Sequence, residues 1–231
     1  MDYKKNEKYF ETIHYKGKIF FIVVGIILIY IGIETLAIVS LIGFFLLALS
    51  IILIVIKKKS IVTDAEYDAS VGSVLNNMQA KALEAVGIDE DEIREIAPVS
   101  FQGYVYNGAT QFKKGKDGLW RTNKYEYVII FFCENELHYY RYSFNTTSSN
   151  NTNNEFVGYG NTGVYFYNDI VTIKIQAEPV HILDQCITCE FVQLITVAGT
   201  EFSVAFRDDG TAKRSINAMR ALIIAKKREN H

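Results

Sequence analysis

The sequence predicts an α+β membrane protein. Its parts are an N-terminal hairpin of two transmembrane helices, a helical connector, and an antiparallel β-barrel or sandwich with a C-terminal amphipathic helix. Three observations predict this order: residues 19–56 are almost wholly apolar, apolar side chains alternate with period two from residue 99 onward, and residues 212–223 have helical spacing. Two prolines and three cysteines in 231 residues exclude a collagen-like chain and a disulfide-rich secreted scaffold.

The apolar stretch is too long for one membrane span. As a single helix, Ile19–Ile56 would be about 57 Å long at 1.5 Å per residue, whereas the hydrocarbon core of a bilayer is about 30 Å thick. Two spans, at about 19–33 and 36–56, fit instead. The one charge inside the stretch, Glu34, then lies at the turn between them, which avoids the cost of a carboxylate at the bilayer centre.

Lysines flank both predicted spans and are absent from the turn. The basic N-terminus, residues 1–18, carries five lysines, and Lys57–Lys59 follow the second span. The positive-inside rule therefore predicts a plasma-membrane protein with both termini in the cytoplasm. Small residues in the second span are expected to pack the hairpin against itself, with oligomerisation as the lesser alternative. They are Ala37, Ser40, Gly43, Ala48 and Ser50.

Residues 57–98 are predicted to form a helical connector. Thr63-Asp64-Ala65-Glu66 has the spacing of a capping box, and the apolar residues that follow predict one helix over about 64–86, stopped by Gly87. The acidic run at 89–92 resembles the start of a calcium loop, but its sixth position is Arg94 instead of glycine. It is better explained as the start of a short second helix that Pro98 ends.

Residues 99–231 are predicted to form the β domain. Six to seven strands are expected from the β-branched and aromatic runs, with a polar loop at 145–155 and a hairpin turn at 198–200. A final helix begins near Asp208-Asp209-Gly210. It is predicted to turn one apolar face inward and to end in cations that suit a helix C-terminus. That face consists of Ala212, Ile216, Met219 and Ile223.

This order of strands followed by one helix resembles a pleckstrin-homology-like barrel of the bacterial PH and GRAM superfamily, over about Val99–Lys227. A narrower resemblance, to uncharacterised bacterial two-span membrane proteins with such a cytoplasmic domain, is carried by three stretches. They are KALEAVGID at 81–89, KGKDGLWR at 114–121 and YFYNDIV at 165–171. The resemblance implies binding of lipids, peptides or proteins more than catalysis, although fold alone does not decide function.

Motifs that would indicate an enzyme or a metal site are weak. GxGxxG at 158–163 lacks the strand before it and the helix after it that a dinucleotide site needs, so a flexible glycine loop is expected. Cys186 and Cys189 form CxxC in a predicted strand, where residues three apart point to opposite faces and cannot chelate together. Cys133 is likewise expected to be an ordinary strand cysteine. We therefore expect no catalytic residue, no metal and no cofactor.

The resemblance also makes one basic stretch a candidate ligand site, because lipid-binding PH domains often hold a phosphorylated headgroup in a loop between the first two strands. In this chain the stretch consists of Lys113, Lys114, Lys116, Trp120, Arg121 and Lys124. Cations near an anionic membrane surface contribute about 1 kcal/mol each. The alternative is a solvated basic loop whose tryptophan caps the barrel. Residues 60–231 carry a net charge of −6, which opposes a general attraction to anionic membranes.

Three functions follow from these features. The first is a membrane-anchored cytoplasmic interaction module that binds a protein or peptide partner without catalysis. The second is a module that senses anionic lipid headgroups through the basic stretch. The third is an accessory or regulatory subunit of a membrane transporter or enzyme complex. No nucleic acid partner is expected.

Overall fold

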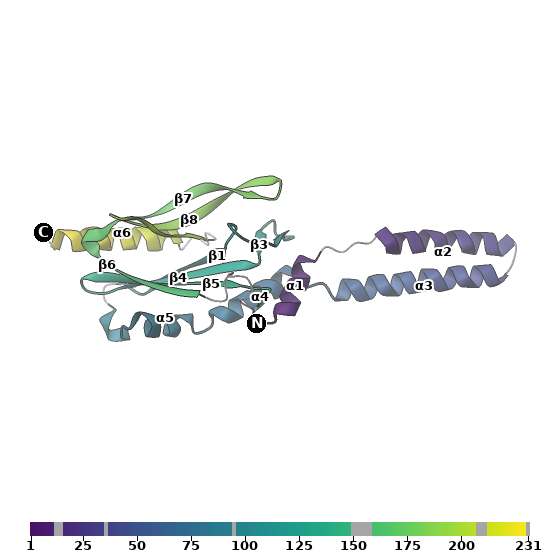
Figure 1. Cartoon of the computed structure of the whole chain (residues 1–231), viewed down its shortest axis with the longest axis horizontal. Helices are drawn as coiled ribbons and strands as arrows, with labels where there is room; N and C mark the ends of the chain where they lie inside the picture. The colour runs from purple at the N-terminus through teal and green to yellow at the C-terminus, as the bar shows by residue number, and fades with distance from the viewer. Residues whose placement is uncertain (12–15, 35–36, 94–95, 149–158, 207–211, 230–231) are drawn as a thin grey trace. The chain divides into compact units, whose positions relative to one another are not determined.

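The structure is a computed structural model of the chain, which describes residues 1–11, 16–34, 37–93, 96–148, 159–206 and 212–229. The chain has the predicted α+β composition, with helices first, antiparallel sheets next and a helix last (Figure 1). It divides into two compact units. The helical unit is Glu7–Tyr67, and the β unit comprises Met1–Asn6 with Asp68–His231.

The helical unit contains a hairpin of two apolar helices, α2 (Lys16–Glu34) and α3 (Ala37–Lys59), which lie side by side in Figure 1. Glycines bring the two backbones close, because a Cβ on Gly32 would lie 2.3 Å from the backbone nitrogen of Ser40. The hydroxyl of Ser40 also donates to the carbonyl oxygen of Ile29 at 3.2 Å. The prediction that small residues pack the hairpin against itself is confirmed for Ser40 and Gly43, whereas Ala37 and Ala48 are exposed.

Of these two helices, Ala37–Lys58 is long and apolar enough to cross a membrane. The segment Gly17–Ile33 is equally apolar in character but shorter. The predicted turn lies between positions 33 and 36; Glu34 is the last residue of α2, and positions 35 and 36 lie outside the described residues. Two further helices, α1 (Tyr3–Phe10) and α4 (Asp64–Leu75), each begin in one unit and end in the other.

The prediction of one helix over 64–86 is wrong. Helix α4 ends at Leu75, and α5 (Met78–Val86) begins after Asn77, whose φ of 61° places it in the left-handed region. Asparagine adopts this conformation at lower cost than most residues, so it can break a helix without a glycine. The capping box at Thr63–Glu66 and the stop at Gly87 are confirmed. The predicted second helix is a single 3-10 turn, η1 (Glu90–Glu92).

The strands of the β unit form three antiparallel sheets. The first has the order β1 (Val99–Tyr104), β4 (Lys124–Phe132), β5 (Glu136–Asn145) and β6 (Tyr159–Phe166). After the 3-10 turn η2 (Tyr167–Asp169), the second has the order β7 (Ile170–Ile182), β8 (Gln185–Thr196) and β9 (Gly199–Ala205). Strands β2 (Phe112–Lys114) and β3 (Trp120–Thr122) make a small separate hairpin. The predicted barrel does not close, because no ladder joins the sheets among the described residues.

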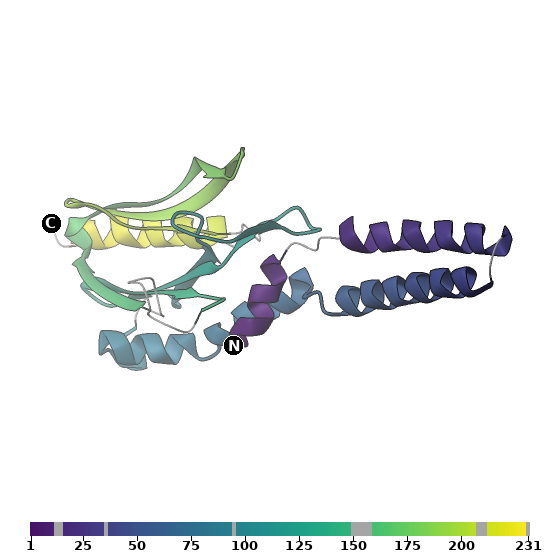
Figure 2. The same ribbon diagram turned by 45° about the vertical axis from the view of Figure 1, so that its right-hand side comes forward.

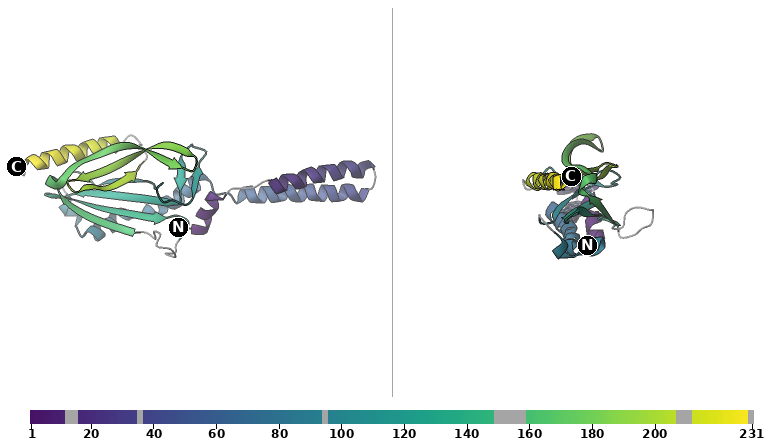
Figure 3. Two further views of the ribbon diagram at one scale, coloured as in Figure 1. Left: turned by 45° about the horizontal axis from the view of Figure 1, so that its top comes forward. Right: turned by 90° about the vertical axis from the view of Figure 1, so that its left-hand side faces the viewer.

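One hydrophobic core is shared by the two larger sheets and the C-terminal helix α6 (Ala212–Glu229), and a second core lies between β4 and α5. The views in Figures 1 and 3 agree that α5 and α6 lie on opposite sides of the four-stranded sheet. Strand β4 therefore contributes buried side chains to both cores. The predicted inward face of the last helix is confirmed, since Ala212, Ile216, Met219 and Ile223 are all buried. Its predicted start at 208–210 lies outside the described residues.

The second and third glycines of the GxGxxG motif are not in a flexible loop, which corrects the sequence-based expectation for them. Gly160 and Gly163 lie in strand β6, beside the tyrosines of β5. A Cβ on Gly163 would lie 2.4 Å from the ring of Tyr139, and one on Gly160 would lie 2.7 Å from the hydroxyl of Tyr140. Aromatic rings thus cover these positions. Gly158 and most of the predicted polar loop lie outside the described residues.

Candidate functional site

The basic stretch folds into the β2–β3 hairpin instead of an open loop. Lys114 pairs with Trp120 and Lys113 pairs with Arg121, so each pair shares one face of the hairpin. The turn is closed by a hydrogen bond from the backbone nitrogen of Gly115 to the carbonyl oxygen of Leu119, at 2.8 Å. The pairing therefore sends Lys114 and Trp120 to one face and Arg121 to the other.

Arg121 is held by two carboxylates. Its Nε donates to Asp68 Oδ1 at 2.7 Å, and its Nη2 donates to Asp68 Oδ2 at 2.7 Å. Its Nη1 and Nη2 donate to the two oxygens of Asp117 at 2.9 and 2.8 Å. These bonds hold the pKa of Asp117 well below its usual range. The side chain of Arg121 is only 2% exposed, so its guanidinium stabilises the fold instead of facing solvent.

The other candidate residues are also separated by the fold. Lys124 is buried at the start of β4, Lys113 is partly buried on the Arg121 face, and Lys116 is exposed in the turn of the hairpin. Only Lys114 and Trp120, of the six residues proposed from the sequence, line a well-formed cavity of the β unit. The sequence-based site is thus divided, and one part of it borders a cavity.

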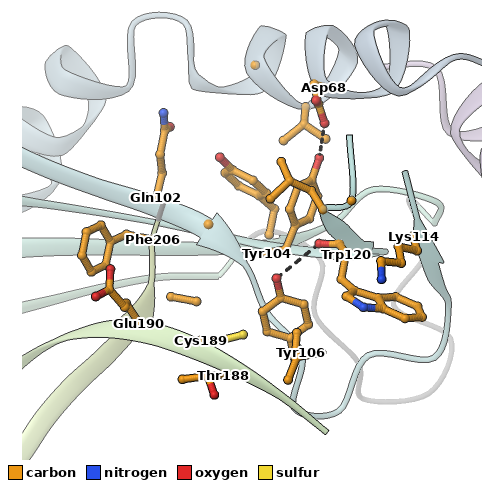
Figure 4. A pocket seen from close by; sticks show the side chains of 18 of the residues that line it. Asp68, Gln102, Tyr104, Tyr106, Lys114, Trp120, Thr188, Cys189, Glu190 and Phe206 are labelled. Carbon is orange, nitrogen blue, oxygen red and sulfur yellow. Dashed lines mark hydrogen bonds between the residues drawn. The ribbon is translucent and has the colours of Figure 1, made fainter. Parts of the chain in front are cut away.

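This cavity has a volume of about 630 Å³ and is lined mainly by aromatic and aliphatic side chains. We call it the aromatic pocket. Helix α4, strand β1, the β2–β3 hairpin and strand β8 contribute to its walls (Figure 4). Its aromatic residues are Tyr104, Tyr106, Trp120, Tyr125 and Phe206, and its charged residues are Asp68, Lys114 and Glu190. A concave, mostly apolar cavity with a few polar groups is typical of a binding site.

Hydrogen bonds fix two phenols of the aromatic pocket. Tyr104 Oη donates to Asp68 Oδ1 at 2.7 Å, and Tyr106 Oη donates to the carbonyl oxygen of Trp120 at 3.2 Å (Figure 4). Burial raises the pKa of Tyr106, with the neighbouring Cys189 as a second cause. Burial also raises the pKa of the Cys189 thiol. Both groups are therefore neutral near pH 7, and Cys189 lacks the thiolate character of a reactive cysteine.

Tyr125 provides a prediction about pH. Burial and the nearby negative charge of Asp68 raise its pKa to about 12, whereas a tyrosine in the unfolded chain ionises near pH 10. Between these values the unfolded state loses a proton that the folded state keeps, so the free energy of unfolding falls as the pH rises from about 10 to 12. Absorbance titration of phenolate should show a transition near pH 12 that Tyr125→Phe removes. A wild-type protein whose tyrosines all ionise near pH 10 while it remains folded would contradict this assignment.

One polar atom of the aromatic pocket has no partner among the described residues. The indole Nε1 of Trp120 is buried and makes no hydrogen bond in that part of the chain. Buried donors in folded proteins are nearly always satisfied, and those that are not are often completed by water or a ligand. The described residues contain no group of three His, Cys, Asp or Glu side chains placed to hold a metal ion. The pocket thus has the character of a binding site.

Most of the aromatic pocket could not be found from the sequence. Asp68, Tyr104, Tyr125 and Phe206 lie far apart in the chain, and no spacing pattern connects them. The alternation of tyrosines at Tyr104 and Tyr106 was the one visible signal. Comparison with models of protein families, with curated proteins and with solved structures finds no match for this chain.

Proposed function

We propose that the chain is a membrane-anchored interaction module whose β unit binds a protein or peptide partner in the aromatic pocket. The observation that carries this proposal is the pocket itself, in which five aromatic side chains surround a cavity of about 630 Å³. Aromatic residues are enriched at protein interfaces because they offer a large apolar area together with a polar group. No reaction is assigned to the pocket.

The membrane anchor in this proposal is the α2–α3 hairpin. Only 11% of the most apolar window of α3 is buried, whereas the core helix of a soluble protein is mostly buried. Exposed apolar side chains on both helices would be covered by lipid. The shorter segment Gly17–Ile33 completes a second span, and the flanking lysines favour cytoplasmic termini. This arrangement would present the β unit to cytoplasmic partners.

Binding of anionic lipid by the basic stretch is the second candidate, and the exposure of Lys114 and Lys116 favours it. Arg121 weighs against it, because two carboxylates already occupy its guanidinium group. Asp117 also places a negative charge within the same hairpin. A protein or peptide in the aromatic pocket is therefore the better-supported ligand.

Photo-crosslinking in native membranes tests the proposal and separates the two candidates. A photoreactive amino acid at Leu119, which lines the aromatic pocket, should give discrete protein or peptide adducts. The same amino acid at Lys81, exposed on α5, serves as the control and should not give them. Trp120→Ala should reduce the Leu119 adducts by more than about tenfold, because buried aromatic side chains often dominate interface energy. Adducts with lipid alone, or identical adducts from both positions, would overturn the proposal.

A further inference from the structure

Strand β8 continues beyond its partner β9. Residues Phe191–Thr196 of β8 pair with β9 on one edge and with β7 on the other. Residues Gln185–Cys189 pair with β7 alone, so β7 and β8 run on together as a two-stranded ribbon (Figure 2). Among the described residues, no strand pairs with the second edge of this part of β8. We call residues 185–189 along this edge the open edge of β8.

The register shows which backbone groups point toward the open edge. Thr188 lies opposite Pro179, and proline has no N–H to donate to its partner. In an antiparallel pair, hydrogen-bonded and non-hydrogen-bonded positions alternate, so Thr188 directs its N–H and C=O away from β7. The backbone nitrogen of Phe206 donates to the carbonyl oxygen of Glu190 at 3.2 Å, so Glu190 also directs its backbone groups away from β7. Thr188 and Cys186 follow Glu190 at every second position and point the same way. Cys186 and Thr188 therefore face the open edge.

This edge forms one wall of the aromatic pocket. Four consecutive residues, Ile187–Glu190, line the cavity. Successive side chains of a strand point to opposite faces, so four in a row can border one cavity only along the edge of the strand. Figure 4 shows β8 passing beneath Tyr106 with Thr188, Cys189 and Glu190 at the cavity. The backbone N–H and C=O groups at the open edge of β8 therefore lie beside the aromatic pocket.

The outer edge of β7, on the other side of the same ribbon, differs from the open edge of β8 because it contains a proline. The alternation that turns Thr188 toward the pocket turns the nitrogen of Pro179 toward the outer edge of β7, where it offers no donor. Proline at an edge is one of the devices that prevent a further strand from adding. Within residues 185–189 of β8 there is no proline. The outer edge of β7 therefore disfavours pairing with a further strand, whereas the open edge of β8 permits it.

We infer that the partner is an extended peptide segment that pairs with the open edge of β8 at Cys186 and Thr188, in line with β9, and places an apolar side chain in the aromatic pocket. Main-chain pairing with an exposed sheet edge is an established mode of peptide recognition. This inference rests on the proposed function and names the form of the partner.

Charge favours an acidic residue in this peptide. Lys114 is exposed at the pocket, and no ion pair with it is found among the described residues. Of the two carboxylates of the pocket, that of Asp68 is occupied by Arg121 and Tyr104, and Glu190 belongs to β8, so an acidic peptide residue is expected only beside Lys114 on the β2–β3 hairpin. A peptide carboxylate beside Lys114 would satisfy this cation. The expected ligand is therefore an extended segment that combines an apolar residue with an acidic one.

The test uses the full chain in detergent micelles and a phage-displayed library of random linear dodecapeptides as the probe. Selected peptides are synthesised, and each backbone nitrogen is methylated in turn. Pairing with β8 predicts that methylation weakens binding about tenfold at alternate positions and has little effect between them, because only every second residue donates to the strand. Acidic and apolar residues should be enriched among the selected sequences.

Protein variants complete the test. Thr188→Pro removes the N–H at the open edge and should weaken binding about tenfold, the equivalent of one lost hydrogen bond. His181→Pro is the matched control, because its N–H points to the outer edge of β7, and it should leave binding unchanged. Loss of binding in Trp120→Ala but not in Thr188→Pro, together with no alternation on methylation, would overturn strand pairing and retain the proposed function. Failure to select any peptide that depends on Trp120 would overturn both.

Discussion

Replacing Asp68 and Asp117 together by alanine is expected to lower the free energy of unfolding by about 3 kcal/mol, because it removes both carboxylates that hold the buried guanidinium of Arg121. The guanidinium of Arg121 makes four hydrogen bonds to these two carboxylates, at 2.7–2.9 Å. Asp117→Ala alone should cost less than half of this loss, since Asp68 still pairs with Arg121. Asp68→Ala alone should cost somewhat more than Asp117→Ala, because it also removes the acceptor of the Tyr104 hydroxyl. The effect of the two replacements is therefore expected to be greater than additive.

Urea unfolding of the full chain in detergent, followed by the fluorescence of its one tryptophan, measures this loss. Asp184→Ala, at the exposed tip of the β7–β8 hairpin, is the matched control and should change stability little. Adding Arg121→Met to the double variant removes the buried charge that has lost both carboxylates and should restore much of the stability. A triple variant no more stable than the double variant would show that charge is not the cause of the loss.

Gly103→Ala is expected to cost about 3 kcal/mol, at the upper end of the range for overpacked positions. A Cβ at Gly103 in β1 would lie 1.9 Å from the carbonyl oxygen of Ala205 in β9 and 2.6 Å from its carbonyl carbon. Both atoms belong to the backbone and cannot rotate away. Strands β1 and β9 would have to separate at this point, which would also disturb the aromatic pocket that Gly103 and Ala205 border.

The same substitution at Gly72 is the control for this prediction. Gly72 lies within α4, and a Cβ there meets no atom within 4 Å. Alanine is the better helix former by about 1 kcal/mol, so Gly72→Ala should stabilise the chain. Thermal unfolding monitored by circular dichroism compares the two variants. Equal melting temperatures for Gly103→Ala and the wild type would contradict the close approach of β1 and β9.

Local patterns predicted the two apolar helices, the C-terminal helix and most strands, but they missed helix α1 and the break at Asn77. Contacts between distant segments decided the rest. The spacing of Ala212, Ile216, Met219 and Ile223 was sufficient to predict the buried face of α6, because helical period and burial agree there. The glycines at 160 and 163 could not be interpreted without knowing that tyrosines cover them from the neighbouring strand.

The candidate site shows the same limit. The resemblance to lipid-binding PH domains makes the basic stretch at 113–124 a candidate site, but sequence alone does not reveal that Arg121 meets Asp68, which lies 53 positions earlier. The register of β2 and β3 then separates Lys113 from Lys114, since neighbouring strand residues point to opposite faces. The charge pattern predicts a basic surface, but the ion pairs and the strand register of these residues decide which of the cations are exposed on it.

Strand β4 connects the two cores of the β unit. Its residues Val128–Phe132 are at most 2% exposed, with alternate side chains in the core beneath α5 and in the core that contains α6. Strands β1 and β5 pair with its two edges. Because both cores contain side chains of β4, neither core can be fully exposed while the other stays intact. The amide protons of β4 should therefore exchange with solvent only through global unfolding, making the two layers one cooperative unit.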